Sequence, residues 1–116
     1  MLFSEDRVCF VQRDGSLTTT LEVLVSGEDD CEARRLSLAN GGWRARELDV
    51  TSYAELALAA ASADEAHPAF SKLFVSTEYL PEFGALIATR RPRTPEEPPI
   101  WAAHFAVVEG GITAEP

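Results

Sequence analysis

Two tryptophans are the side chains of this sequence best suited to hold an organic ligand. An exposed indole stacks on the apolar face of a sugar ring while nearby polar groups bond the hydroxyls. Trp43 follows the turn signal Asn40-Gly41-Gly42, of the left-handed kind, so we expect it at a loop tip. Trp101 opens an apolar run typical of a strand, so we expect it in the core. For each ring, simple packing is the competing interpretation.

The histidines and acidic residues give a weaker indication of chemistry. Dinucleotide-binding, Walker and serine-hydrolase signatures are absent from the sequence, and so is a His/Cys cluster with metal-ligand spacing. His67 and His104 lie far apart along the chain. Glu78 and Glu109 could form the carboxylate pair of a hydrolase, although such residues usually lie on solvated strand edges. The sequence therefore predicts no catalytic residue, no metal site and no cofactor.

The charge balance argues against two classes of partner. Nineteen acidic residues against ten basic ones give a net charge of -9, and the nine arginines form no basic run. Such a chain repels phosphate backbones and anionic membrane surfaces, so we expect no nucleic-acid partner. A length of 116 residues with 46% apolar residues matches one soluble globular domain.

Cysteine content and hydropathy favour a cytoplasmic location. Cys9 and Cys31 are too few for a zinc site or a disulfide-stapled fold, and both lie in strand-like runs, so we expect buried residues with free thiols. The longest apolar stretch, Leu56–Ala63, is far shorter than the ~20 residues of a membrane span. Ser4-Glu5-Asp6 interrupts any signal-peptide core. We therefore expect a cytoplasmic protein, or a cytoplasmic part of one.

Alternating or apolar runs separated by turn residues predict strands that would position these side chains. Asp14-Gly15 is a strong hairpin signal, because glycine accepts the positive φ of a tight turn. Every second residue from Leu17 to Val25 is mostly apolar, which predicts that this face is buried. The predicted strands are 7–13, 16–25, 31–39, 43–53 with a continuation into the first half of 54–61, 73–79, 85–90 and 100–108.

The remaining segments are predicted to be irregular. Residues 62–67 form a polar loop, Pro68 holds the chain extended at His67, and the proline-rich segment 91–99 is a surface loop. Segments 31–39 and 43–53 are expected to pair as a second hairpin. The predicted fold is all-β, an antiparallel β-sandwich, with one domain over 1–110 and a frayed tail over 111–116.

Four runs of the sequence resemble the amino-terminal β-sandwich of glycoside hydrolase family 94, in the phosphorylase-like part of cyclic β-1,2-glucan synthases. The resemblance covers residues 3–110. In that family the sandwich is of the galactose mutarotase-like supersandwich type and lies beside a helical barrel that holds the general acid and the phosphate site. The resemblance therefore implies a non-catalytic piece of a larger sandwich, whose parent could be attached to the inner membrane. The runs are His67–Phe74, Ala88–Arg93, Trp101–His104 and Leu48–Glu55.

This resemblance implies a domain that binds β-glucan oligosaccharide or supports the glucan-processing barrel. Its partners would be the glucan and the remainder of the parent polypeptide. An alternative is a protein-interaction module whose exposed sheet edges pair with another copy, as a homodimer, or with the remainder. If the chain contacts sugar, aromatic rings would stack and charged groups would bond hydroxyls. The candidate carbohydrate-binding residues are Trp43, His67, Phe70, Lys72, Tyr79, Arg90 and Arg91.

Overall fold

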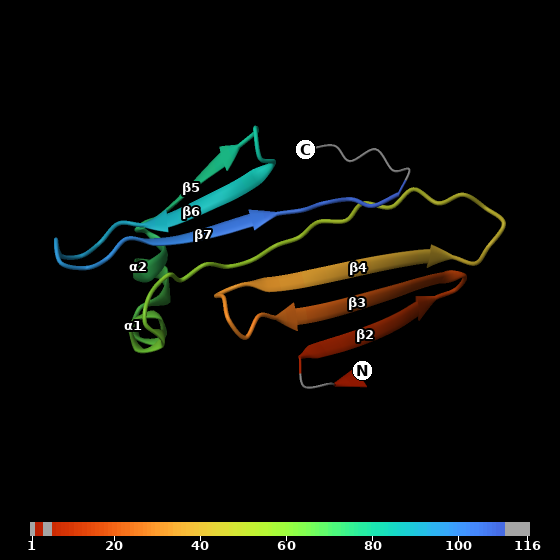
Figure 1. Cartoon of the computed structure of the whole chain (residues 1–116), viewed down its shortest axis with the longest axis horizontal. Coiled ribbons are helices and arrows are strands. Elements are labelled where there is room, and N and C mark those ends of the chain that lie inside the picture. Colours follow the sequence, from red (N-terminus) through yellow and green to blue (C-terminus); the bar gives the residue numbers. More distant parts are fainter. Residues whose placement is uncertain (1, 4–5, 111–116) are drawn as a thin grey trace. The chain divides into compact units, whose positions relative to one another are not determined.

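The computed structural model describes residues 2–3 and 6–110. Within them the chain forms seven strands and two short helices, and every strand pair is antiparallel. The predicted all-β antiparallel class is confirmed. The chain divides into two compact units, residues 1–51 and 52–116, each with its own sheet (Figure 1). None of the described helices is long and apolar enough to cross a membrane.

The first unit is a four-stranded meander in which neighbouring strands follow one another in sequence. Gly15 begins the two-residue turn between the second and third strands with φ +59°, so the predicted hairpin is confirmed. The next connection is held by Ser26 Oγ, which accepts hydrogen bonds from the amides of Glu28 and Asp29 at 3.2 and 3.1 Å. In order across the sheet, the strands are β1 (Leu2–Phe3), β2 (Arg7–Asp14), β3 (Leu17–Val25) and β4 (Glu32–Asn40).

One face of this sheet carries most of its large apolar side chains, together with the ion pair between Arg34 and Glu32. Directly opposed residues of an antiparallel sheet point to the same side, and Phe10, Leu21 and Leu36 form one such row across β2, β3 and β4. The prediction that this face is buried is wrong, because within residues 6–51 no side chain is buried. We call this surface the apolar face of the first sheet; its residues are Val8, Phe10, Leu17, Leu21, Val23, Leu36 and Leu38.

The opposite face of the first sheet is more polar, although Val11 and Leu24 lie on it, and it carries a small charge network. Glu22 in the middle of β3 accepts from Arg7 of β2 at 3.4 Å, and its second oxygen lies 3.9 Å from Arg35 of β4. Threonines and a serine surround these charges on the same face. Water can solvate such a face, so it needs no protein neighbour, whereas the face with more apolar side chains is stabilised when another surface covers it.

Residues 41–60 form no strand, so the predicted second hairpin and its continuation are wrong. The amide of Gly41 donates to the Ser16 carbonyl at 2.8 Å, and the Asn40 side chain then donates to the Arg44 carbonyl at 2.7 Å. These bonds direct the chain out of the sheet, so the alternating residues that follow find no strand to pair with. The turn has no residue with positive φ, which corrects the left-handed turn expected at residues 40–42.

The second unit has a three-stranded sheet with β6 (Ala85–Arg90) in its centre. Gly84, at φ +57°, closes the turn between its first two strands, and the proline-rich segment 91–99 connects the last two. The loop at 91–99 is therefore confirmed, and the last strand ends at residue 105 and not at residue 108. The elements are α1 (Ala61–Ala66), α2 (Pro68–Lys72), β5 (Val75–Leu80), β6 (Ala85–Arg90) and β7 (Ile100–Phe105).

The two helices were not expected from the sequence. Residues 62–67 were predicted to be a loop, yet they mostly form α1. His67 is extended, at φ -148° and ψ 70°, as predicted for a residue before proline, but Pro68 itself begins α2. Proline is well placed there, because the first turn of a helix needs no amide donor from it.

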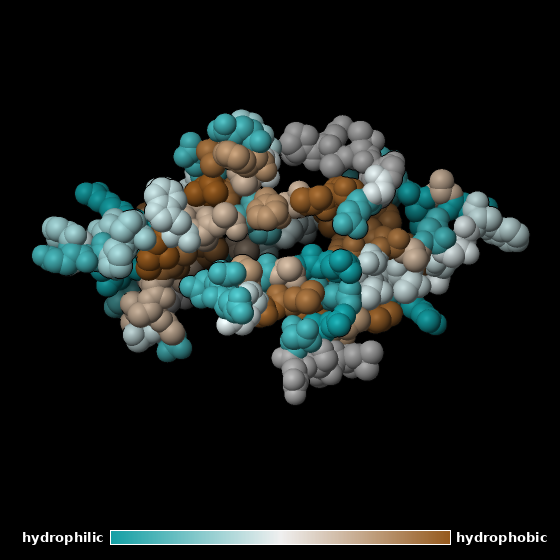
Figure 2. Space-filling model, in the orientation of Figure 1, coloured by the Kyte–Doolittle hydropathy of each residue, from teal (hydrophilic) through white to brown (hydrophobic). Residues whose placement is uncertain are grey.

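The second unit holds the buried residues of the described chain. Ala85 and Ala88 of β6 are the buried apolar residues, and Arg90 at the end of that strand is buried as well. Trp101 is 64% exposed, so its expected place in the core is wrong. Figure 2 shows apolar surface open to solvent among hydrophilic side chains in both units. The predicted frayed tail, 111–116, lies outside the described residues.

Both cysteines are free thiols, as predicted, but neither is buried. Cys9 is half-buried in β2, and Cys31 is exposed immediately before β4. Burial was expected because strand-like runs usually supply core residues. Neither face of the first sheet is completely covered, so both thiols keep some exposure.

Candidate functional site

Trp43 stands at a loop tip, as predicted, and its side chain is 101% exposed. The turn that presents it is held by Asn40, whose Oδ1 accepts the Gly42 amide at 3.1 Å. A Cβ on Gly42 would lie 2.7 Å from Ser16 Oγ, so glycine lets the chain pass close to the hairpin. Gly41, Gly42 and Trp43 line an open hollow on this surface. The arrangement offers one flat indole to a ligand, supported by a braced turn.

The other six candidate residues lie in the second unit, so no single unit contains the whole predicted set. His67 joins α1 to α2 and is exposed. Phe70 of α2 is exposed and packs edge-to-face against Phe74, with ring centroids 5.2 Å apart. Tyr79 of β5 lies on the sheet face opposite to that of Glu78.

Lys72 is engaged in an ion pair with an acidic residue of the preceding segment. Its Nζ lies 2.7 Å from Glu55 Oε2, and the Tyr53 hydroxyl donates to Glu55 Oε1 at 3.3 Å. The hydrogen bond from Lys72, its positive charge and the Tyr53 hydroxyl lower the pKa of Glu55. Glu55 therefore keeps its negative charge at neutral pH, and Lys72 is partly neutralised toward any ligand.

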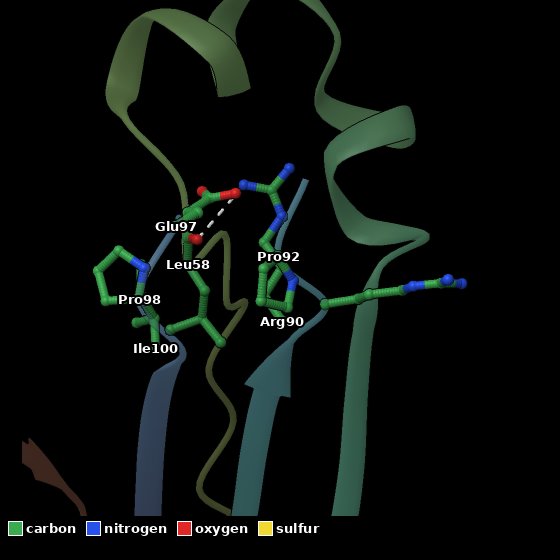
Figure 3. Close-up of a pocket in the computed structure, with 7 residues that line it drawn as sticks. Leu58, Arg90, Pro92, Glu97, Pro98 and Ile100 are labelled. Carbon is green, nitrogen blue, oxygen red and sulfur yellow. Dashed lines mark hydrogen bonds between the residues drawn. The ribbon is translucent and has the colours of Figure 1, made fainter. Parts of the chain in front are cut away.

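Arg90 is buried, whereas Arg91 beside it is exposed. Arg90 Nη1 donates to the Leu58 carbonyl at 3.4 Å. The Nε and Nη2 atoms of Arg90 have no hydrogen-bond partner within the described part of the chain. Figure 3 shows this guanidinium reaching the Leu58 carbonyl in a narrow hollow that Glu97 also lines. The Arg91 amide donates to the Phe74 carbonyl at 3.0 Å. Arg90 therefore holds the segment around Leu58 in place, and its buried side chain leaves little surface for an external ligand.

Two exposed aromatic residues of β7 lie on one face of the sheet, and the sequence did not predict this pair. Trp101 and Phe105 are 64% and 66% exposed, and residues four apart in a strand point to the same face. The signal was present in the alternation of 101, 103 and 105. This alternation does not distinguish an exposed tryptophan from one in the core, which is the usual place of a tryptophan that opens an apolar strand.

The sheet edges are also open to partners. β4 is an edge strand of nine residues, and all of them are exposed. Unpaired amides and carbonyls along such an edge can accept another strand. Elsewhere, among the described residues, no group of three or more His, Cys, Asp or Glu side chains could hold a metal ion.

Comparison with known proteins places the chain in a family. A family model described as the supersandwich domain of glycosyl hydrolase 94 matches residues 1–115. The chain is also 40% identical, over 109 residues, to the cyclic beta-(1,2)-glucan synthase NdvB of Rhizobium meliloti (strain 1021). That match covers 94% of this chain and 4% of the relative, so the chain spans a small part of that protein's length. The resemblance inferred from the sequence is thus confirmed, and the chain belongs to the glycosyl hydrolase 94 family as its supersandwich domain.

Proposed function

We propose that this chain is a non-catalytic supporting domain, which docks through the apolar face of the first sheet onto the rest of a glucan-processing polypeptide. The observation that carries the proposal is the exposure of this face: Phe10 is 43% exposed, and Leu36 and Leu38 are each 41% exposed. Leaving apolar surface in water costs about 25 cal/mol per Å². A partner that covers this face gains that free energy.

The opposite face of the same sheet supports this assignment. Arg7, Glu22 and Arg35 form their charge network there, and water satisfies such groups without a partner. The face with more large apolar side chains gains more from cover than the face with the Arg7, Glu22 and Arg35 network. The partner in this proposal is the remainder of the parent polypeptide, because the glucan synthase to which this chain is similar is about 25 times longer.

The proposal assigns no reaction to this chain. Cleavage of a glycosidic bond needs a carboxylic acid that holds its proton near neutral pH, which requires a raised pKa. Glu55 has its pKa shifted in the opposite direction by Lys72, so it is a poor general acid. The proposal places the chemistry of a parent enzyme in the remainder of the longer polypeptide, of which this chain spans a small part.

The docking role is tested by charged substitutions on the two faces of one strand, within the longer polypeptide that carries this domain. Leu36→Asp with Leu38→Asp places two charges on the apolar face, and Ser37→Asp places one on the polar face between them. We expect the double variant to release the domain to limited proteolysis and to lower glucan output about tenfold or more. Ser37→Asp should leave both unchanged. Intact proteolytic protection in the double variant would overturn the proposal.

A second candidate role, contact with glucan, is favoured by the complete exposure of Trp43 on a braced turn. An indole without packing partners loses nothing when it stacks on a sugar. Titration of the Trp101→Phe chain with β-1,2-gluco-oligosaccharides follows Trp43 alone, because the sequence contains two tryptophans. A blue shift or quench at millimolar sugar supports this role, and a constant emission excludes it.

The third possibility, pairing through a sheet edge, is favoured by the fully exposed β4. A second copy or another strand could extend the first sheet there. Gel filtration of the chain should then show a dimer that Leu36→Pro returns to monomer, because proline removes an amide donor from the edge. A monomer at all concentrations would exclude self-pairing.

A further inference from the structure

We propose that a second surface, the face of β5, β6 and β7 that carries Trp101 and Phe105, binds a neutral oligosaccharide. The inference rests on the glucan-processing context proposed above, but it requires neither the docking face nor Trp43. We call this surface the aromatic face of the second sheet. It lies entirely within one unit, so its geometry is set by the register of a single sheet.

The aromatic face has two rings with small residues between them. Four residues at about 3.3 Å each separate the Trp101 and Phe105 backbones by ~13 Å along β7. Ala103 lies midway between them, and its directly opposed neighbour on β6 is Ile87. Ile87 is half-buried, and Ala85, which opposes Phe105 on the same face, is buried. The spacing exceeds one hexose ring, so a chain of sugars, and not a single one, would contact both rings.

Polar groups lie on the same face, on the two neighbouring strands. Ile87 is opposed on β5 by Glu78, and Thr89, the neighbour of Trp101, is opposed by Ser76. Glu78 and Ser76 are both exposed. Apolar surface with a few well-placed polar groups is the usual composition of a small-ligand site, and here a carboxylate and a hydroxyl could accept hydrogen bonds from sugar hydroxyls.

The charge of Glu78 distinguishes sugar from other occupants. A protein that covered this face would bury an ionised carboxylate and would have to supply a cation to it. An acidic polysaccharide would be repelled, both by Glu78 and by the net charge of -9. A neutral sugar donates hydroxyl hydrogen bonds to the carboxylate and stacks on the rings, so it suits both Glu78 and the two aromatic residues.

The two tryptophans allow the proposal to be tested separately from Trp43. In the Trp43→Phe chain, Trp101 is the remaining indole, and its emission should shift on titration with β-1,2-gluco-oligosaccharides. Phe105→Ala and Glu78→Gln should each weaken binding several-fold. Leu86→Ala, at an exposed position on the opposite sheet face, is the matched control and should bind as before. Constant Trp101 emission, or a response confined to Trp43, would overturn the proposal.

A second measurement covers variants that fold poorly in isolation. In the longer polypeptide, Trp101→Ala with Phe105→Ala should lose retardation on electrophoresis through a gel that contains β-glucan, while proteolytic protection of the domain is retained. Loss of protection with retained retardation, as expected for Leu36→Asp with Leu38→Asp, reports on the docking role alone. Unchanged retardation in the aromatic variant would contradict sugar binding at this face.

Discussion

The two sheets of this protein differ in how their central strands are covered. The first sheet has the longer strands, yet within residues 6–51 no side chain is buried. The second sheet has six-residue strands, and its central strand buries Ala85 and Ala88. The second unit also contains segment 56–59, which is half-buried and bonded to Arg90 through Leu58. Strand length and apolar content alone therefore do not decide which sheet forms a core.

The largest expected effect comes from placing the same charge at the centre of one sheet and at the edge of the other. Ala88 is 4% exposed, so Ala88→Asp buries a carboxylate without a partner and should destabilise its unit by roughly 3–5 kcal/mol. Ala39 of β4 is exposed, so Ala39→Asp should change stability by less than about 0.5 kcal/mol. Urea unfolding followed by circular dichroism measures both. Equal effects would remove the distinction between the sheets.

The next effect concerns the buried charge at the end of β6. Arg90 has two nitrogen atoms without hydrogen-bond partners among the described residues, and desolvating such groups is unfavourable. Arg90→Met keeps the length of the side chain and should raise the free energy of unfolding by about 1 kcal/mol or more. Arg91→Met, at an exposed position, serves as the control. A loss of stability in Arg90→Met would show that a partner for the guanidinium exists in solution.

The hairpin turns should behave alike in the two units, because each depends on one left-handed glycine. Gly15 and Gly84 have φ of +59° and +57°, and an L-residue there costs about 1–2 kcal/mol. Gly15→Ala and Gly84→Ala should therefore lower the free energy of unfolding by similar amounts. Gly27→Ala, where the glycine has no positive φ and open space around it, should not destabilise. A difference between the two turns would indicate that packing against the rest of the unit also contributes to the change in the free energy of unfolding.

The smallest effect is the pH dependence of the exposed pair in the second unit. Lys72 lowers the pKa of Glu55 in the folded state, so this pair stabilises the fold at a pH above the unfolded value of about 4.3. The contribution is lost as the pH falls through the lowered pKa. The difference in melting temperature between the natural chain and Glu55→Gln should therefore shrink between pH 7 and about pH 3. A constant difference would show that Lys72 does not act through charge.

Local signals predicted the elements that depend on neighbouring residues. Asp14-Gly15 specified a hairpin, and prolines kept 91–99 out of the sheet, because turn chemistry acts within a few residues. Alternation over 43–53 failed, since it shows which side chains share a face but not whether a partner strand exists. Helices of five or six residues, such as α1 and α2, are too short to give a clear period.

The candidate site was predictable in part for the same reason. The loop position of Trp43 followed from a local glycine pair and is confirmed. The exposure of Trp101 depends on what covers β7, which the strand's own residues do not encode. The assembly of seven residues into one site required knowledge of two units, and the structure assigns Trp43 to one and the other six to the other.

The backbone of Leu58 gives the second unit a defined place to open first. This residue has a φ of 48°, a conformation unfavourable for leucine by about 1–2 kcal/mol, and its carbonyl is held by Arg90 alone among the described side chains. Release of that single bond also releases the conformational strain. Amide hydrogens near residue 58 should therefore exchange with deuterium through local opening, well before those of β6.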